Sequence, residues 1–150
     1  MTDPRPSGDF AHAPVLLEEA VAALAPRDDG VYVDGTLGAG SYSRALLAAA
    51  RCRVIGIDRD PRAVERAGAL ALAHPGRFTV LEGRFGDMET LLAALGISAV
   101  AGIALDLGVS SPQLDDPARG FSFRADGPLD MRMGRGGTSA ADLVNTLPEA

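Results

Sequence analysis

The feature that most constrains the fold of this chain is a regular alternation of short apolar runs with helix-forming segments. Four runs rich in valine, isoleucine and leucine are predicted to be strands, at residues 31–34, 53–58, 78–81 and 99–105. Predicted helices accompany them at residues 15–24, 43–51, 61–73 and 88–95. Strands that alternate with helices form parallel sheets with right-handed crossovers. The pattern therefore predicts an α/β fold with a doubly wound parallel sheet.

Helix-ending and helix-starting residues support these boundaries. Pro26 stops the first helix, and Gly96 closes the fourth. Asp60 is placed to cap the third helix, with Pro61 at its first position. The strand and helix units therefore repeat along residues 11–106, which we interpret as a Rossmann-like cofactor-binding core.

The character of the chain changes after residue 106. Residues 107–138 are rich in Gly, Pro, Ser and Arg, which predicts a long loop of the kind that carries substrate-binding or active-site groups. Residues 139–142 resemble a capping box, so residues 139–150 are predicted to begin a helical insertion. Residues 1–10 are predicted to be a mobile N-terminus. Because the predicted fourth strand has an uncovered apolar edge, we expect the domain to continue beyond this chain.

Composition limits the class of protein. The chain has 150 residues, 47% of them hydrophobic, which fits one globular domain. Its net charge of −6 gives no general attraction to phosphate, so any nucleic-acid contact must be local. A single cysteine and no apolar signal segment predict a cytoplasmic protein, and no membrane span is expected. The two histidines lack partners at metal-ligand spacing, so no metal site is predicted.

A glycine-rich turn follows the first predicted strand, with the sequence Asp-Gly-Thr-Leu-Gly-Ala-Gly at residues 34–40. Glycines such as Gly38 and Gly40 let a ligand approach the backbone, and the following helix offers free N–H groups. Asp58, at the end of the second strand, is placed to accept hydrogen bonds from ribose hydroxyls. The pattern predicts an adenosine-containing cofactor, with a tight turn that binds nothing as the alternative.

Two residues separate the candidate cofactors. Ser43 stands where the dinucleotide fingerprint has its third glycine, which weakens a pyrophosphate site. Asp34 would repel a pyrophosphate but attract the sulfonium and ammonium groups of S-adenosylmethionine. Charge therefore favours the methyl donor. An NAD(P)-dependent oxidoreductase remains an alternative at this point, as does a non-catalytic nucleoside-binding module.

The segment after the fourth strand carries candidate reacting groups. Asp106 lies at the carboxyl end of that strand, where open α/β sheets bind ligands. Phe85, after the third strand, is placed either to cover an adenine or to pack in the core. Four arginines interleaved with apolar residues suit RNA phosphates and a stacked base, or else pair with nearby aspartates: Arg119, Arg124, Arg132 and Arg135, with Asp115, Asp116, Asp126 and Asp130.

Together, residues 12–21, 34–40, 57–61 and 106–133 resemble the bacterial 16S rRNA (cytosine-N4) methyltransferases of the MraW (RsmH) family. Members of that family are longer, so the chain resembles their N-terminal half. The resemblance implies S-adenosylmethionine as cofactor and 16S rRNA in the small ribosomal subunit as substrate. It implies cofactor contacts at Gly40, Ser41, Tyr42, Asp58, Phe85, Asp106 and Gln113. The family usually has glycine where this chain has Ser41, which would be strained if the position requires a positive φ.

The predicted reaction requires a hydrogen-bond acceptor beside the target amine. The lone pair of cytosine N4 is delocalised into the ring, so the amine is a poor nucleophile. Asp106 or Ser110 could accept a hydrogen bond from it and receive its proton; these two are the candidate catalytic residues. Methylation at pyrimidine C5 normally uses a cysteine, yet Cys52 precedes the second strand, at the opposite end from the expected site. Amine methylation is therefore favoured.

Overall fold

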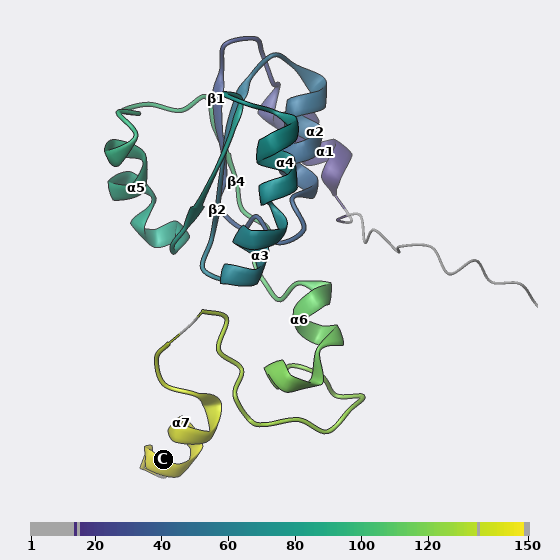
Figure 1. The fold of residues 1–150 in the computed structure, drawn as a ribbon, viewed down its shortest axis with the longest axis vertical. Helices are drawn as coiled ribbons and strands as arrows, with labels where there is room; N and C mark the ends of the chain where they lie inside the picture. Colours follow the sequence, from purple (N-terminus) through teal and green to yellow (C-terminus); the bar gives the residue numbers. More distant parts are fainter. Residues whose placement is uncertain (1–13, 15, 135, 149–150) are drawn as a thin grey trace, which may run out of the picture.

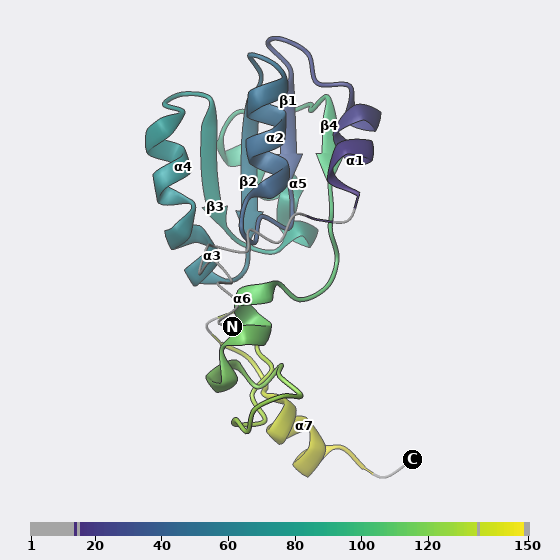
Figure 2. The same cartoon turned by 90° about the vertical axis from the view of Figure 1, so that its right-hand side faces the viewer.

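The computed structural model describes residue 14 and residues 16–134 and 136–148. Its centre is a parallel sheet of four strands, β1 (Val31–Asp34), β2 (Arg53–Asp58), β3 (Phe78–Glu82) and β4 (Gly102–Ala104). The strand order is β3-β2-β1-β4, as the face view in Figure 2 shows. This order matches the first four strands of the Rossmann arrangement and confirms the predicted doubly wound sheet.

Helices cover both faces of the sheet (Figure 1). On one face lie α1 (Leu17–Leu24), α2 (Ser41–Ala49), α3 (Pro61–Arg66) and α4 (Gly68–Ala73), and on the other lies α5 (Met88–Ala94). The short 3-10 helix η1 (Phe85–Asp87) precedes α5. Beyond the carboxyl ends of the strands lie α6 (Ser111–Asp115), the 3-10 helix η2 (Pro117–Arg119) and α7 (Ala140–Thr146). The segment after β4 therefore sits at the edge of the sheet where ligands are expected.

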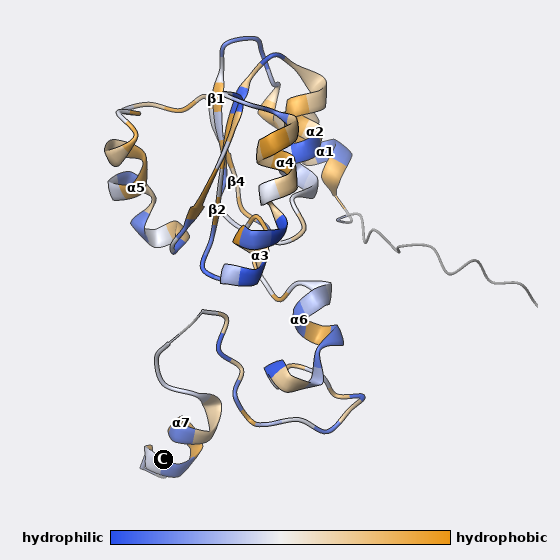
Figure 3. Cartoon of the chain, in the orientation of Figure 1, coloured by the Kyte–Doolittle hydropathy of each residue, from blue (hydrophilic) through white to orange (hydrophobic). Residues whose placement is uncertain are grey.

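Alternating strand residues build an apolar core on each face. Tyr32 and Val54 pack with Leu46 of α2, whereas the neighbouring Val33 and Ile55 pack with Leu92 of α5. This two-residue period follows from the strand backbone, whose side chains point alternately to opposite faces. Figure 3 shows the strands coloured largely as hydrophobic.

Three predicted elements differ from the structure. The predicted helix 61–73 is two helices, interrupted at Ala67 just before Gly68, a residue with weak helix preference. The predicted strand 99–105 pairs only over Gly102–Ala104, and β1 is its partner. The predicted loop 107–138 contains α6 and η2. The signal for α6 is present in the sequence, since Ser110 and Gln113 have the spacing of a capping box.

Other predictions concern the two ends of the chain. The predicted capping box before α7 is confirmed, because Ser139 and Asp142 bond reciprocally at its first turn. The predicted mobile N-terminus, residues 1–10, lies outside the described residues. Within the part that the structure describes, each helix is too short or too polar to span a membrane.

Candidate cofactor site

The turn between β1 and α2 has the backbone conformation that its glycines permit. Gly38 has φ 49° and Gly40 has φ 78°, in the left-handed region that side chains disfavour. Ser41 begins α2 directly after Gly40 and is not among the described residues with positive φ. The strain considered for Ser41 therefore does not arise, because Gly40 carries the left-handed conformation.

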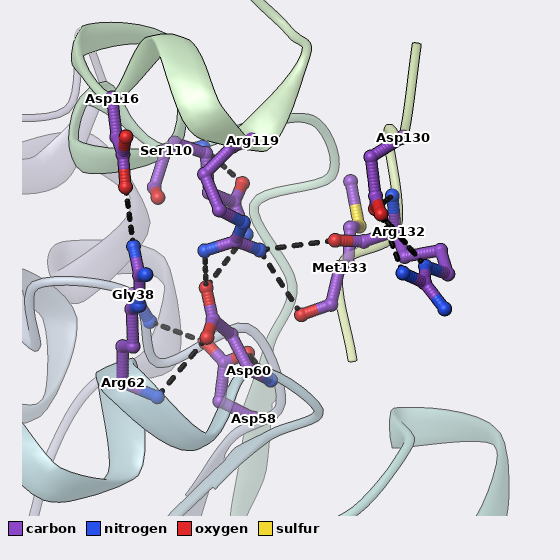
Figure 4. Close-up of polar contacts among 11 residues, drawn as sticks. Gly38, Asp58, Asp60, Arg62, Ser110, Asp116, Arg119, Asp130, Arg132 and Met133 are labelled. Carbon is purple, nitrogen blue, oxygen red and sulfur yellow. Dashed lines mark hydrogen bonds and ion pairs between the residues drawn. The ribbon is translucent and has the colours of Figure 1, made fainter. Parts of the chain in front are cut away.

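Asp58 faces this turn from the end of β2 (Figure 4). Its Oδ2 accepts a hydrogen bond from the N–H of Gly38 at 2.7 Å, and its Oδ1 accepts one from the N–H of Asp60 at 2.8 Å. The side chain is only partly buried. Since each carboxylate oxygen has two lone pairs, Asp58 keeps acceptor capacity for a ribose.

Asp34 is fully buried beneath the same turn. Its Oδ2 accepts hydrogen bonds from the hydroxyl of Ser43 at 2.7 Å and from the Ser43 N–H at 3.1 Å. Its Oδ1 has no partner among the described residues. The pKa of Asp34 is raised to about 6, mainly by burial and to a smaller extent by the negative charge of Asp58, against the lowering effect of the Ser43 bonds. A cation near the turn would stabilise the ionised form.

The surroundings of Tyr42, in the first turn of α2, are also acidic. Burial raises the pKa of its phenol, and the negative charges of Asp106 and Asp34 add to that increase. Together with Asp58, these carboxylates surround the glycine turn. Such a site fits a ligand with positive charge and opposes a pyrophosphate.

Asp106 and Ser110 both lie beside the turn. The backbone N–H of Asp106 donates to the hydroxyl of Thr36 at 2.7 Å, and the Asp106 side chain is exposed. A β-carbon built on Gly38 would lie 3.9 Å from the Cβ of Ser110. The structure therefore brings both candidate catalytic residues to the glycine turn, to which Asp58 is hydrogen-bonded.

Two further predicted contacts occupy different environments. Phe85 is 46% exposed, and its Cβ would lie 3.3 Å from a β-carbon added at Gly35, so it borders the turn and is not a core residue. Gln113 is buried; its Oε1 accepts from the N–H of Ser110 at 2.9 Å, and its Nε2 donates to Asp60 at 3.2 Å. Contact between Gln113 and the cofactor stays a prediction.

The predicted pairing of the arginines with nearby aspartates is right for one of them. Arg132 binds Asp130 through several hydrogen bonds, the shortest 2.5 Å. Arg119 instead pairs with Asp60, 59 positions earlier in the chain, and Asp116 pairs with Arg62. Within the described residues no ion pair is present for Arg124, and Arg135 lies outside them. The sequence did not predict the pairing of Asp60 with Arg119, because no local signal joins them.

Among the described residues, one hollow lies away from the glycine turn. A hollow of about 280 Å³ lies at the amino ends of β1 and β4, between residues 27–31 and 99–101, and contains none of the predicted site residues. The described residues contain no group of three or more His, Cys, Asp or Glu side chains placed to hold a metal ion. The glycine turn is therefore the candidate site.

The strand order, the glycine turn after β1 and the acid at the end of β2 define a Rossmann-like, nucleotide-binding type of domain. A family model described as the MraW methylase family matches residues 9–150, and the chain belongs to that family. This membership agrees with the resemblance seen in the motifs.

Relatives of known name share much of the sequence. Over 139 residues the chain is 69% identical to Ribosomal RNA small subunit methyltransferase H of Rhodospirillum centenum, covering 93% of this chain and 42% of that protein. It is 66% identical over 138 residues to the protein of the same name from Rhodospirillum rubrum, again covering 42% of it. The chain therefore spans less than half the length of these relatives. A solved dimethyladenosine transferase from Plasmodium falciparum aligns with TM-score 0.42 and 25% identity, over 47% of this chain and 26% of that one.

Proposed function

We propose that this chain is the cofactor-binding part of an enzyme that transfers a methyl group from S-adenosylmethionine to the N4 amine of a cytosine in 16S rRNA. Family membership over residues 9–150 and the names of the relatives support methylation of small-subunit rRNA. The choice of the cytosine amine rests on the motif resemblance. The observation that carries the cofactor proposal is the glycine turn surrounded by the carboxylates of Asp34, Asp58 and Asp106.

Each part of the cofactor has a group in this chain that suits it. Asp58 would accept hydrogen bonds from the ribose hydroxyls, and Phe85 would border the adenine. Gly38 and Gly40 of the turn, with Ser41 and Tyr42 at the start of α2, would line the site, and Asp106 and Gln113 would lie at its methionine end or its entrance. The Oδ1 of buried Asp34, which has no partner among the described residues, supports this fit, because a nearby positive charge would offset the cost of burying its carboxylate. When bound, the cofactor supplies an electrophilic methyl group.

The chain's own contribution to the reaction is to position the amine and accept its proton. Either the carboxylate of Asp106 or the hydroxyl of Ser110 accepts a hydrogen bond from the cytosine amine, which localises the nitrogen lone pair. Alignment of the two reactants supplies much of the rate enhancement in such a transfer. Asp106 receives the proton that the amine loses.

The environment of Cys52 supports amine methylation over carbon methylation. Cys52 lies just before β2, at the amino end of the sheet, and is 1% exposed. Its thiol donates to the carbonyl of Leu46 at 3.3 Å, and burial raises its pKa. A buried, protonated thiol at the far end of the strands does not serve as a nucleophile at this site.

We assign RNA contact to side chains after β4 that make no side-chain hydrogen bond or ion pair among the described residues. Arg119 and Arg132 are occupied by bonds within the chain. Phe123, by contrast, is fully exposed, and Arg124 beside it is exposed as well. An aromatic ring beside a guanidinium suits a stacked base and its phosphate, so these two residues are our candidates for rRNA contact.

The cofactor assignment is tested by calorimetric titration with S-adenosylhomocysteine and with NADH. We expect saturable binding of S-adenosylhomocysteine alone. Saturable binding of NADH alone would reject the proposal in favour of an oxidoreductase.

The catalytic assignment is tested by methyl incorporation into small ribosomal subunits, using the full-length protein. Asp106→Asn is expected to lower turnover by at least tenfold while the free energy of unfolding stays unchanged, because the exposed side chain makes no packing contribution. Asp115→Asn, an exposed carboxylate on α6, is the control and should retain turnover. Equal loss of turnover and stability in Asp106→Asn would indicate a structural role. Binding of cofactor without methyl incorporation by the unsubstituted protein would favour a nucleoside-binding module.

A further inference from the structure

The carboxylate of Asp60 joins the cofactor side of the molecule to the segment after β4. It is 3% exposed and accepts three hydrogen bonds. Its Oδ1 accepts from the N–H of Arg62 at 3.0 Å, which caps α3. Its Oδ2 accepts from Nε2 of Gln113 at 3.2 Å and from Nη1 of Arg119 at 2.8 Å. The capping role was predictable, whereas the bonds to Gln113 and Arg119 come from the later segment.

Arg119 extends this connection to the far end of the segment (Figure 4). Its Nη2 donates to the carbonyl oxygens of Arg132 at 3.1 Å and Met133 at 3.3 Å. Its own carbonyl accepts from the N–H of Met131 at 3.1 Å. The Arg119 side chain is 13% exposed. Through its largely buried guanidinium and its backbone carbonyl, Arg119 therefore holds residues 131–133 close to Asp60.

The same connection reaches the proposed ribose acceptor. The N–H of Asp60 donates to Oδ1 of Asp58, whose other oxygen binds Gly38 of the glycine turn. A β-carbon built on Gly134 would lie 3.3 Å from the carbonyl oxygen of Arg59, so the end of the segment passes directly against the connection between β2 and α3, beside Asp58 and Asp60. Polar contacts thus run without a gap from the cofactor turn through Asp58, Asp60 and Arg119 to residues 131–133.

The charges of Asp60 and Arg119 make this ion pair sensitive to substitution. Burial alone raises the pKa of Asp60, but hydrogen bonds from Arg119, the Arg62 N–H and Gln113 outweigh it and hold the pKa below its ordinary value. Removal of the arginine would leave a buried carboxylate without its counter-charge. A second ion pair, Arg62 with Asp116 at 2.5 Å, joins the same two parts but is exposed, 55% and 32% for its side chains. The Arg62–Asp116 pair supplies a matched control, since exposed ion pairs contribute little to stability.

We propose that Asp60 and Arg119 form a positioning pair that holds the substrate segment, residues 107–134, in place beside the cofactor turn for methyl transfer. Neither residue is assigned a contact with the reacting atoms; the pair acts through the placement of Asp106 and Ser110 relative to the turn. The inference rests on the proposed function. It assigns to two residues 59 positions apart a role that is separate from cofactor binding.

The test compares Arg119→Gln, Arg119→Lys and Asp116→Asn in the full-length protein. Three quantities are measured for each: S-adenosylhomocysteine affinity, kcat with small ribosomal subunits, and amide hydrogen exchange of residues 117–134 against that of β1 and β2.

In Arg119→Gln we expect kcat to fall at least tenfold, affinity to change less than threefold, and exchange to increase in the segment only. Arg119→Lys keeps the charge but cannot reach Asp60 and both carbonyls together, so kcat should be intermediate. Asp116→Asn should match the unsubstituted protein.

Several outcomes would overturn the inference. One is that Arg119→Gln matches Asp116→Asn in kcat, even if exchange of the segment increases. Another is a parallel loss of affinity, kcat and strand protection, which would indicate general destabilisation; Arg119→Lys, the milder change, would then show the same parallel loss. If the unsubstituted protein neither binds S-adenosylhomocysteine nor transfers methyl groups, the proposed function fails separately. Hydrogen exchange still tests the anchoring in that case, and unchanged protection in Arg119→Gln would contradict it.

Discussion

The sheet core and the segment after β4 are stabilised in different ways. In the core, residues such as Leu46, Ile55 and Val33 are completely buried between the sheet and its helices. After Ala104, Gln113 is the only buried residue among those that the structure describes. The segment is held mainly by polar contacts, of which those of Arg119 and Arg132 are examples. Burial of a large apolar side chain contributes about 1.5–3 kcal/mol, whereas one hydrogen bond contributes about 1 kcal/mol net.

Because of this difference, we expect the sheet core and the segment after β4 to respond to different substitutions and solution conditions. The core depends on packing and is insensitive to any single exposed charge. The segment depends on particular charged groups and on the turn against which it rests. Hydrophobic side chains that remain exposed along the β4 edge and the segment mark the same contrast, Ile103, Leu105 and Leu107 being 45%, 47% and 67% exposed. That a further part of the protein covers this edge stays a prediction.

The largest expected effect tests the packing of the core. Leu46→Ala removes a completely buried side chain from the cluster between α2 and the sheet and is expected to lower the free energy of unfolding by about 2–5 kcal/mol. Leu72→Ala, on a side chain that is 86% exposed, is the control and should change it by less than about 0.5 kcal/mol. Urea unfolding measures both. Similarly small changes in the free energy of unfolding of the two variants would contradict the view that apolar burial is the main source of stability in the core.

A pH-dependent effect of similar size is expected at Asp34. Its pKa is about 6 in the folded protein and 3.8 ordinarily, so between these values the unfolded chain releases a proton that the folded one keeps. The contribution of Asp34 to stability is therefore most favourable below pH 3.8, falls as pH rises toward 6, and is lower by on the order of 3 kcal/mol above it. Asp34→Asn removes this dependence. In urea unfolding, the variant should gain stability relative to the unsubstituted protein as pH rises from 4 to 7. A difference in free energy of unfolding that stays constant over this range would contradict the raised pKa.

A smaller effect is expected on cofactor binding at the turn. Asp58→Ala removes the proposed ribose acceptor and should weaken S-adenosylhomocysteine binding by about 1–3 kcal/mol. Because Asp58 also binds the N–H groups of Gly38 and Asp60, Asp58→Asn is the milder comparison. Calorimetry measures both affinities. Unchanged affinity in Asp58→Ala would remove this residue from the site.

The smallest expected effect is a difference between the segment after β4 and the sheet core in their response to acidic pH. Hydrogen bonds from Arg132 hold the pKa of Asp130 at about 2, and the pKa of Asp60 is also lowered. These groups stabilise the folded segment above pH 3.8, and their contribution is lost as pH falls toward 2. Asp60 also caps α3 of the core, but there the protonated form that Asp34 favours opposes the loss. Pepsin digestion between pH 4 and 2 should therefore cut residues 116–134 before the core, and simultaneous cleavage would contradict the contrast.

Several features of the site could be predicted because they depend on residues that are close in sequence. The left-handed glycines, Asp60 as a helix cap, and the capping boxes at Ser110 and Ser139 all follow from short patterns. The position of Asp58 opposite the glycine turn follows from the parallel order of the strands. The split of the predicted helix at Ala67 and the short pairing of β4 could not be derived, since tertiary packing sets where an element ends.

The amino-acid sequence by itself determined the alternation of strands and helices and the glycine turn with its acid neighbours, because side-chain period and backbone preference are local properties. Only the tertiary structure decided that Arg119 pairs with Asp60 and not with an aspartate near it in sequence. Charges of opposite sign attract without regard to chain position, and several aspartates were available. The fold selects the partner by bringing one carboxylate, buried and already capping a helix, within reach of the guanidinium.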